Sequence, residues 1–128
     1  NVGLGIVHSM AHGLSALYDT PHGVACAIIL PTGLEYNKSA AGDRYRAIGQ
    51  AMGVAGIDAM SEAEAIDATI AAVKQLSADV GIPAGLQGIL KEEDVAFLSA
   101  SAYADACRPG NPRDTNEAEI AALYRSLM

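Results

Sequence analysis

Apolar residues recur at helical spacing along most of the chain. The clearest run follows Ser61, where large aliphatic residues return every three or four positions: Ile66, Ile70, Val73, Leu76 and Val80. This spacing places them on one face of an amphipathic helix. Ser61 and Glu64 form the capping-box pattern that begins such a helix, and the Gly81–Pro83 segment ends it.

The same reasoning predicts helices in the rest of the chain. We expect them over 1–18, from 22 to about 39, between a cap at Asp43 and Gly53, over about 92–107, and after a cap at Thr115. Thr20 is the candidate cap of the second helix, with Pro21 at its first position. No segment shows a convincing strand pattern. The predicted fold class is therefore all-α, a helical bundle of about six helices.

The second predicted helix indicates that the chain belongs to a larger body. Its apolar residues lie on nearly all sides, which is typical of a buried helix. Pro31 removes one backbone donor and is expected to kink this helix near Ala27. The chain also begins at Asn1, without methionine, inside an apolar stretch. We expect it to be a fragment, with an apolar face left exposed by the parts that are missing, which would favour self-association.

Composition narrows the possible functions. The 128 residues are 51% hydrophobic, enough for one domain or a piece of one with a real core. The net charge of −7, without a basic stripe, argues against a nucleic-acid partner. The longest apolar run, 24–31, is too short to span a membrane, and no signal peptide is evident. The two separated cysteines suit a reducing cytoplasm.

All three histidines fall within the first 22 residues. His8 and His12 are four positions apart and share one face of the first predicted helix. His22 lies in the first turn of the next helix, where the helix dipole disfavours protonation. Neutral imidazole is the form that binds metals, so one interpretation is a divalent metal site between two helices. The other is that each histidine is an ordinary surface or hydrogen-bonded residue, and the spacing leaves both open.

Two further polar positions receive structural interpretations. Cys26 lies in an apolar helix and is expected to be inert, because burial raises the pKa of a thiol. Arg113 follows the turn-rich segment 108–112 and could meet an anion. A turn held by its own side chains is the favoured interpretation of that segment.

The histidine-containing segments resemble the iron-containing (group III) alcohol dehydrogenase family. Residues 5–12 match its G-x-x-H-x-x-x-H signature, and P-H-G follows at 21–23. Residues 104–107 and 110–113 resemble its near-terminal segment, so the likeness runs over essentially the whole chain. The chain departs from the family pattern at Thr32, where the family often has His, at Ser15, where it often has Gly, and at Cys26, where it often has Asn.

The resemblance implies a fold and a set of site residues. Family members have an N-terminal nucleotide-binding domain and an all-α C-terminal domain, and residues 1–128 correspond to most of the latter. One divalent ion, usually iron and sometimes zinc, is held there by an Asp and three His. Two of these histidines correspond to His8 and His22, while the Asp and the remaining His lie on an earlier helix. His12 corresponds to a histidine close to the metal and the nicotinamide, in the proton path, and is the expected catalytic and cofactor-contacting residue.

The resemblance also implies an activity. The parent protein is expected to interconvert a small alcohol and its aldehyde or ketone, with NAD or NADP as hydride partner and the metal as Lewis acid. A homo-oligomer is expected, and this chain alone is expected to be inactive. Two alternatives remain: a maleylacetate-reductase-like enzyme of the same family, and a stand-alone helical metal-binding or interaction module.

Overall fold

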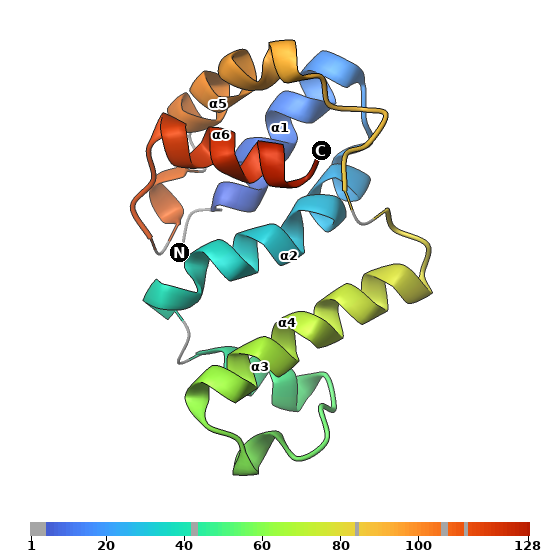
Figure 1. Ribbon diagram of the computed structural model, residues 1–128, viewed down its shortest axis with the longest axis vertical. Coiled ribbons are helices and arrows are strands. Elements are labelled where there is room, and N and C mark those ends of the chain that lie inside the picture. Colours follow the sequence, from blue (N-terminus) through green and yellow to red (C-terminus); the bar gives the residue numbers. More distant parts are fainter. Residues whose placement is uncertain (1–4, 42–43, 84, 106–107, 112) are drawn as a thin grey trace.

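The computed structural model describes residues 5–41, 44–83, 85–105, 108–111 and 113–128, and every regular element within them is a helix (Figure 1). The α-helices are α1 (Ile6–Tyr18), α2 (His22–Ala41), α3 (Tyr45–Ala51), α4 (Glu62–Asp79), α5 (Val95–Ala104) and α6 (Glu117–Ser126). Three short 3-10 helices accompany them: η2 (Ile57–Ala59), η3 (Glu92–Asp94) and η4 (Arg108–Gly110). The predicted all-α fold with six principal helices is confirmed for the described residues.

Helix α2 lies between two groups of helices (Figure 1). On one side α1 packs against α2 and α5, and α5 packs against α6. On the other side α4 packs against α2 and α3. The main hydrophobic core belongs to the first group and is formed by buried residues of α1, α2, α5, α6 and the 86–90 segment. The histidine-bearing helices α1 and α2 therefore both belong to the main hydrophobic core.

Helix α1 is the most deeply buried element of this core. Its Ile6, Met10 and Leu14 side chains have no exposed surface. The Tyr124 hydroxyl, on α6, donates a hydrogen bond to the Met10 carbonyl at 2.8 Å. A methyl group at Gly13 would lie 3.0 Å from Leu98 on α5, so glycine permits the close approach of these two helices. Packing and a buried hydrogen bond together set the position of α1.

Asn111 holds the start of α1 in the absence of a local cap. Gly5 precedes the helix and supplies no side chain, and the Ile6 N–H donates instead to Asn111 Oδ1 at 3.1 Å. The side-chain amides of Asn111 and Asn37 exchange two hydrogen bonds, of 2.9 and 2.7 Å. One half-buried amide pair thus joins the beginning of α1, the C-terminal part of α2 and the segment before α6.

The second helix group confirms the predicted capping box. Ser61 Oγ accepts from the Glu64 N–H at 3.2 Å, and the Glu64 carboxylate accepts from the Ser61 N–H at 3.1 Å. The buried Thr69 hydroxyl lies within hydrogen-bond distance of the Tyr45 carbonyl at 3.0 Å, which links α4 to α3. Gly53, with φ of 79°, follows α3 as the predicted helix stop.

Several predicted helix boundaries shift. The first helix starts at Ile6, and residues 1–4, like the predicted cap Asp43, lie outside the described residues. Asn116, not Thr115, caps α6, because its side chain accepts from the Glu119 N–H at 2.8 Å. The neighbouring asparagine supplies the short side chain at the right position, so the predicted cap was wrong by one residue.

The helices around α2 and α5 also differ from expectation. Pro21 precedes α2 and its carbonyl accepts the first helical hydrogen bond, from Ala25, so the helix proper begins at His22. Helix α2 continues through Pro31, and the kink near Ala27 stays a prediction. The helix expected over 92–107 is a 3-10 turn followed by α5, which ends at Ala104; residue 107 lies outside the described residues.

Helical periodicity did not correctly predict burial along whole faces. Leu17 at the end of α1 is 42% exposed, and Leu76 and Val80 at the end of α4 are more than half exposed. Phe97 on α5 is also more than half exposed. The spacing identifies an apolar face, but whether a neighbour covers that face depends on the tertiary arrangement. Apolar side chains are therefore left at the surface of the described residues, and the expected apolar face that would favour self-association stays a prediction.

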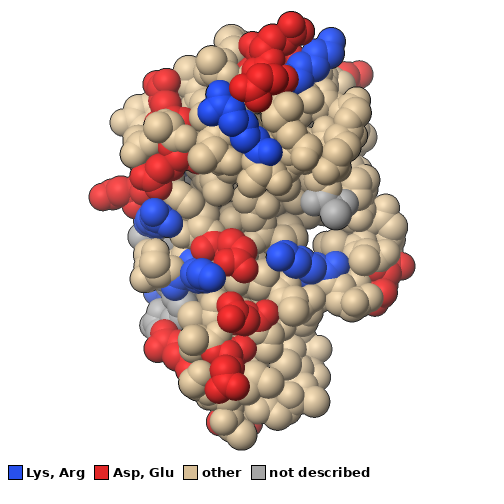
Figure 2. All heavy atoms as spheres, viewed as in Figure 1, with Lys and Arg blue, Asp and Glu red and all other residues tan. Residues whose placement is uncertain are grey.

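The surface carries charges of both signs. On the face shown in Figure 2, basic and acidic side chains are interspersed. Lys38 pairs with Glu35 at 2.8 Å and Arg125 with Glu92 at 3.0 Å. No helix among the described residues is long and apolar enough to cross a membrane.

Gly33 provides a test of the α1–α2 contact. A methyl group at this position would lie 2.6 Å from Val7 Cγ2, on the residue next to His8. We expect Gly33→Ala to be less stable than the matched variant Gly23→Ala by about 1–3 kcal/mol, because the added methyl overpacks the interface. Gly23 also lies on α2 but has no atom within 4 Å of the added methyl. Urea unfolding of both variants measures the difference; equal stabilities would contradict the close contact.

Candidate metal centre

The three histidines lie together where α1 meets α2. His8 and His12 occupy successive turns of α1, and His22 is the first residue of α2. Asp19, with φ of 57°, ends α1 in the left-handed conformation, so the short 19–21 connection turns the chain back. The imidazole centroids of His22 lie 5.5 Å from those of both His8 and His12, and the latter two are 6.3 Å apart.

A set of metal-binding atoms forms within this cluster. Among the described residues, one nitrogen each of His8 and His22 and the Cys26 sulfur all lie within 4.8 Å of one another. His8 and Cys26 are half-buried and His22 is exposed, so the group opens to the surface on one side. Two donors that bind one ion at about 2.0–2.3 Å each can be separated by at most about 4.6 Å. Small side-chain movements would bring all three donors onto one ion.

His12 has a different partner. Its Nδ1 lies 2.9 Å from Asp105 Oδ2, at the end of α5. An ionised carboxylate can only accept a hydrogen bond, so Nδ1 carries the hydrogen and donates it to Asp105. In the neutral ring, Nε2 is then the nitrogen with a free lone pair. The ring itself stacks on His22 with an interplanar angle of 26°.

The structure brings all three predicted histidines into one cluster. Pairing His8 with His12 on one helix face is the simplest interpretation of their spacing, yet the set of donors within 4.8 Å joins His8 to His22 across two helices. This arrangement agrees with the correspondence that the family resemblance supplies. The roles of His8 and His22 as ligands, and of His12 in catalysis and cofactor contact, stay predictions.

Two residues of the cluster were missed from the sequence. Cys26 was expected to be inert, and burial does raise the pKa of its thiol. However, its Sγ lies 3.6 Å from His22 Nε2, and the spacing of four residues on one helix is a signal that could have identified it. Asp105 is 93 residues from His12, and no local pattern points to that pairing.

Arg113 has the structural role that the sequence favours. Its guanidinium donates to the Tyr36 carbonyl at 2.9 Å, pairs with Glu119 at 3.2 Å, and lies 4.1 Å from the centre of the Tyr36 ring. Burial and the hydrogen bond to Glu119 raise the pKa of Tyr36 to about 12. The Asn111 side chain donates to the Arg113 carbonyl at 2.8 Å, as expected for a turn held by its own side chains.

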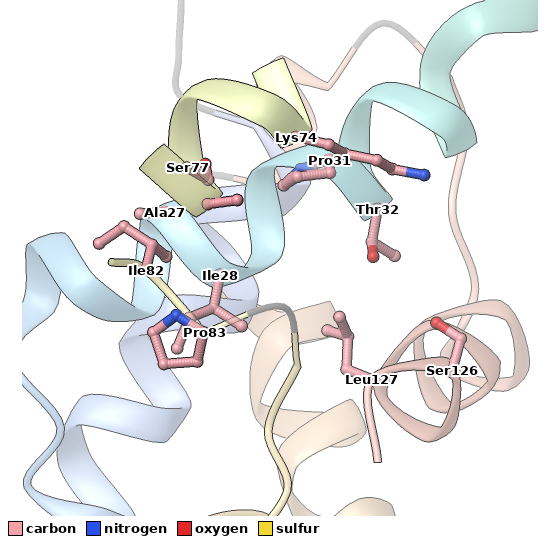
Figure 3. A pocket seen from close by; sticks show the side chains of 11 residues that line it. Ala27, Ile28, Pro31, Thr32, Lys74, Ser77, Ile82, Pro83, Ser126 and Leu127 are labelled. Atoms are coloured by element: carbon pink, nitrogen blue, oxygen red, sulfur yellow. The ribbon is translucent and has the colours of Figure 1, made fainter. Parts of the chain in front are cut away.

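Figure 3 shows a cavity of about 350 Å³. Its walls come from α2, the end of α4, the 82–83 segment and the C-terminal end of α6. Lys74 supplies the charged group of the lining, and aliphatic side chains make up most of the rest (Figure 3). None of the three histidines lines this cavity, so it is separate from the candidate metal centre.

Comparison with known proteins gives the family. The family profile described as "Fe-containing alcohol dehydrogenase family, C-terminal" matches residues 1–128, the entire chain. The chain belongs to the iron-containing alcohol dehydrogenase family. Its all-helical fold is that of the family's C-terminal domain.

The similar curated proteins are longer enzymes. Lactaldehyde reductase of Escherichia coli K12 is 46% identical over 127 residues, which cover 98% of this chain and 33% of the relative. The 1,3-propanediol dehydrogenase of Klebsiella pneumoniae is 43% identical over 126 residues, or 98% of this chain and 32% of the relative. The chain therefore spans about a third of the length of these relatives.

Solved structures give the same result for the fold. The crystal structure of a 1,3-propanediol oxidoreductase superposes with a TM-score of 0.93 at 42% identity, covering 98% of this chain and 33% of that chain. An alcohol dehydrogenase from Oenococcus oeni superposes with a TM-score of 0.92 at 39% identity, with the same coverage of both chains.

The His12–Asp105 contact predicts a defined imidazole tautomer. In the native protein, nitrogen NMR should show the hydrogen of neutral His12 on Nδ1, because the carboxylate accepts it. Asp105→Asn should redistribute the two tautomers, since an amide can both donate and accept. Asp94→Asn is the matched control, because Asp94 accepts from the Tyr18 hydroxyl instead. An unchanged His12 spectrum in Asp105→Asn would contradict the assigned contact.

Proposed function

We propose that this chain is the greater part of the metal-holding helical domain of an NAD(P)-dependent alcohol dehydrogenase, which interconverts a small alcohol and its aldehyde or ketone. The observation that carries the proposal is the meeting of His8 and His22 across α1 and α2, with His12 stacked beside them. The match of the whole chain to the family supports it.

His8 and His22 are the residues that would hold a divalent ion, iron or zinc. Their donor nitrogens come from different helices and lie within the separation that one ion can bridge after small movements. The family resemblance places the other ligands, an Asp and a His, on a helix that precedes this region. When bound, the ion supplies Lewis-acid polarisation of the substrate oxygen.

His12 would move the proton. Asp105 accepts the Nδ1 hydrogen, fixes the ring and leaves Nε2 to exchange a proton with the substrate hydroxyl or with a water beside it. A proton must leave the alcohol as it becomes a carbonyl, so a group of this kind is required near the reacting oxygen. The family resemblance implies that the nicotinamide would lie close to His12.

The described residues do not form a dinucleotide site of their own. They contain no strand, and hence no βαβ unit with a Gly-rich phosphate-binding turn. The family resemblance implies that NAD or NADP binds to an N-terminal nucleotide-binding domain, and we derive no cofactor step from this chain. The relatives named lactaldehyde reductase and 1,3-propanediol dehydrogenase favour a short, oxygenated substrate.

Substitution of the two ligand histidines tests the proposal. In the complete natural polypeptide, His8→Ala and His22→Ala should each weaken binding of zinc or iron(II) by about 100-fold or more, since losing even an outer partner costs roughly 10–100-fold. Both should abolish alcohol oxidation. Equilibrium dialysis with metal analysis measures the binding, and nicotinamide absorbance measures the activity.

His12→Ala is the control for a histidine outside the ligand set. It should keep bound metal and lose kcat, because only proton movement is affected. Undiminished metal binding in both His8→Ala and His22→Ala would contradict the proposed site. Reduction of maleylacetate in preference to simple aldehydes would favour the alternative branch of the family.

The activity is expected to require more than the residues of this chain. The 128-residue chain alone, supplied with iron or zinc, should not oxidise alcohols with NAD or NADP, because it provides two of the four family ligands and no dinucleotide fold. Measurable oxidation under those conditions would contradict this assignment of roles.

A further inference from the structure

We propose that Cys26 is a direct ligand of the divalent ion, and that its sulfur makes this site favour zinc over iron. This inference rests on the proposed metal-binding role of His8 and His22. It adds a donor that the family resemblance does not supply, at a position where the family often has asparagine.

The separation of two donor atoms is the first argument. Cys26 Sγ and His22 Nε2 are 3.6 Å apart. An ion with bonds of about 2.1 Å to nitrogen and about 2.3 Å to sulfur separates those two atoms by about 3.6 Å when the angle between the two bonds is about 110°. The pair is thus already spaced as two ligands of one ion would be.

The helix explains why this spacing is maintained. His22 and Cys26 lie four residues apart on α2, so their side chains project from the same face one turn apart. His8 approaches from α1 and completes a group in which every pair of donor atoms lies within 4.8 Å. Three donors from two packed helices therefore lie in one group, which small side-chain movements would bring onto one ion.

The surroundings of Cys26 suit a ligand. The residue is half-buried, and its sulfur contacts the His22 ring, whereas Cys26 packs against the hydrophobic core on its other side. The thiol and the His22 imidazole lie at hydrogen-bond distance from each other. When an ion binds, the S–H bond breaks, the proton passes to solvent, and the sulfur lone pair forms the metal bond; no redox change is involved.

The consequence is a change in metal preference. Thiolate is a soft ligand that favours zinc, while an asparagine amide oxygen is a hard and weak donor. A site with two imidazoles and a thiolate from this chain should therefore bind zinc more tightly, relative to iron(II), than the same site with asparagine at position 26.

Cobalt(II) spectroscopy tests the sulfur bond directly. The metal-free complete polypeptide is titrated with cobalt(II), and its near-ultraviolet absorption is recorded. The native protein should develop a sulfur-to-cobalt charge-transfer band that Cys26→Asn and Cys26→Ser lack. Cys107→Ser is the matched control, since it removes the other cysteine of residues 1–128 and should leave the band unchanged. X-ray absorption of the zinc-loaded native protein should show sulfur at about 2.3 Å.

Competition between metals tests the preference. Cys26→Asn should weaken zinc binding by roughly tenfold or more and iron(II) binding by less. Circular dichroism and thermal unfolding, recorded without metal for the native protein and for Cys26→Asn, establish that the variant remains folded. An equal effect on the two metals would overturn the preference for zinc.

The outcomes separate this inference from the proposed function. If the native cobalt complex lacks the band while His8→Ala still weakens cobalt binding, the histidine site stands and the role of Cys26 is overturned. If His8→Ala, His22→Ala and Cys26→Asn all bind cobalt as the native protein does, the proposed site and the Cys26 ligand both fail.

Discussion

The close packing of α1 against α2 is the constraint on which the candidate site depends. Gly33 lets α2 approach Val7 and Ile6, and the fully buried Ile6, Met10 and Leu14 hold α1 in the core. His8 follows Val7 directly, so the helix contact sets where its imidazole meets α2. A small rotation of either helix would separate donors that come from different elements. The site is therefore a consequence of core packing rather than of a local loop.

Local signals predicted the helices well. The capping box at Ser61 and Glu64, the stop at Gly53 and the aliphatic spacing of α4 all act within a few residues of one another. The prediction of helix boundaries failed where two neighbouring residues could both serve as the cap, as Thr115 and Asn116 could for α6. The prediction of buried side chains failed where burial depends on elements distant in the sequence, as the exposure of Leu76 and Val80 shows.

The candidate site was predictable only where its residues lie close together in the sequence. The three histidines stand close in sequence and match a family signature, so their clustering could be anticipated. Asp105 could not, because its contact with His12 depends on how α5 packs against α1. Cys26 was within reach of sequence reasoning, since helical spacing alone places it beside His22. Burial alone predicts an inert thiol, whereas the His22 imidazole one helical turn away makes Cys26 a candidate ligand.

The paired amides of Asn37 and Asn111 have a consequence for chain entropy. They connect residues 74 apart, and the Ile6 N–H joins the same oxygen from 105 residues away. An ion shared by α1 and α2 would close a much shorter loop. Closing a longer loop costs more chain entropy, although the cost grows only slowly with loop length. The hydrogen bonds of Asn111 thus join segments near the beginning and the end of the chain in one cooperative unit. An ion held by α1 and α2 would instead connect two neighbouring helices that these hydrogen bonds already join.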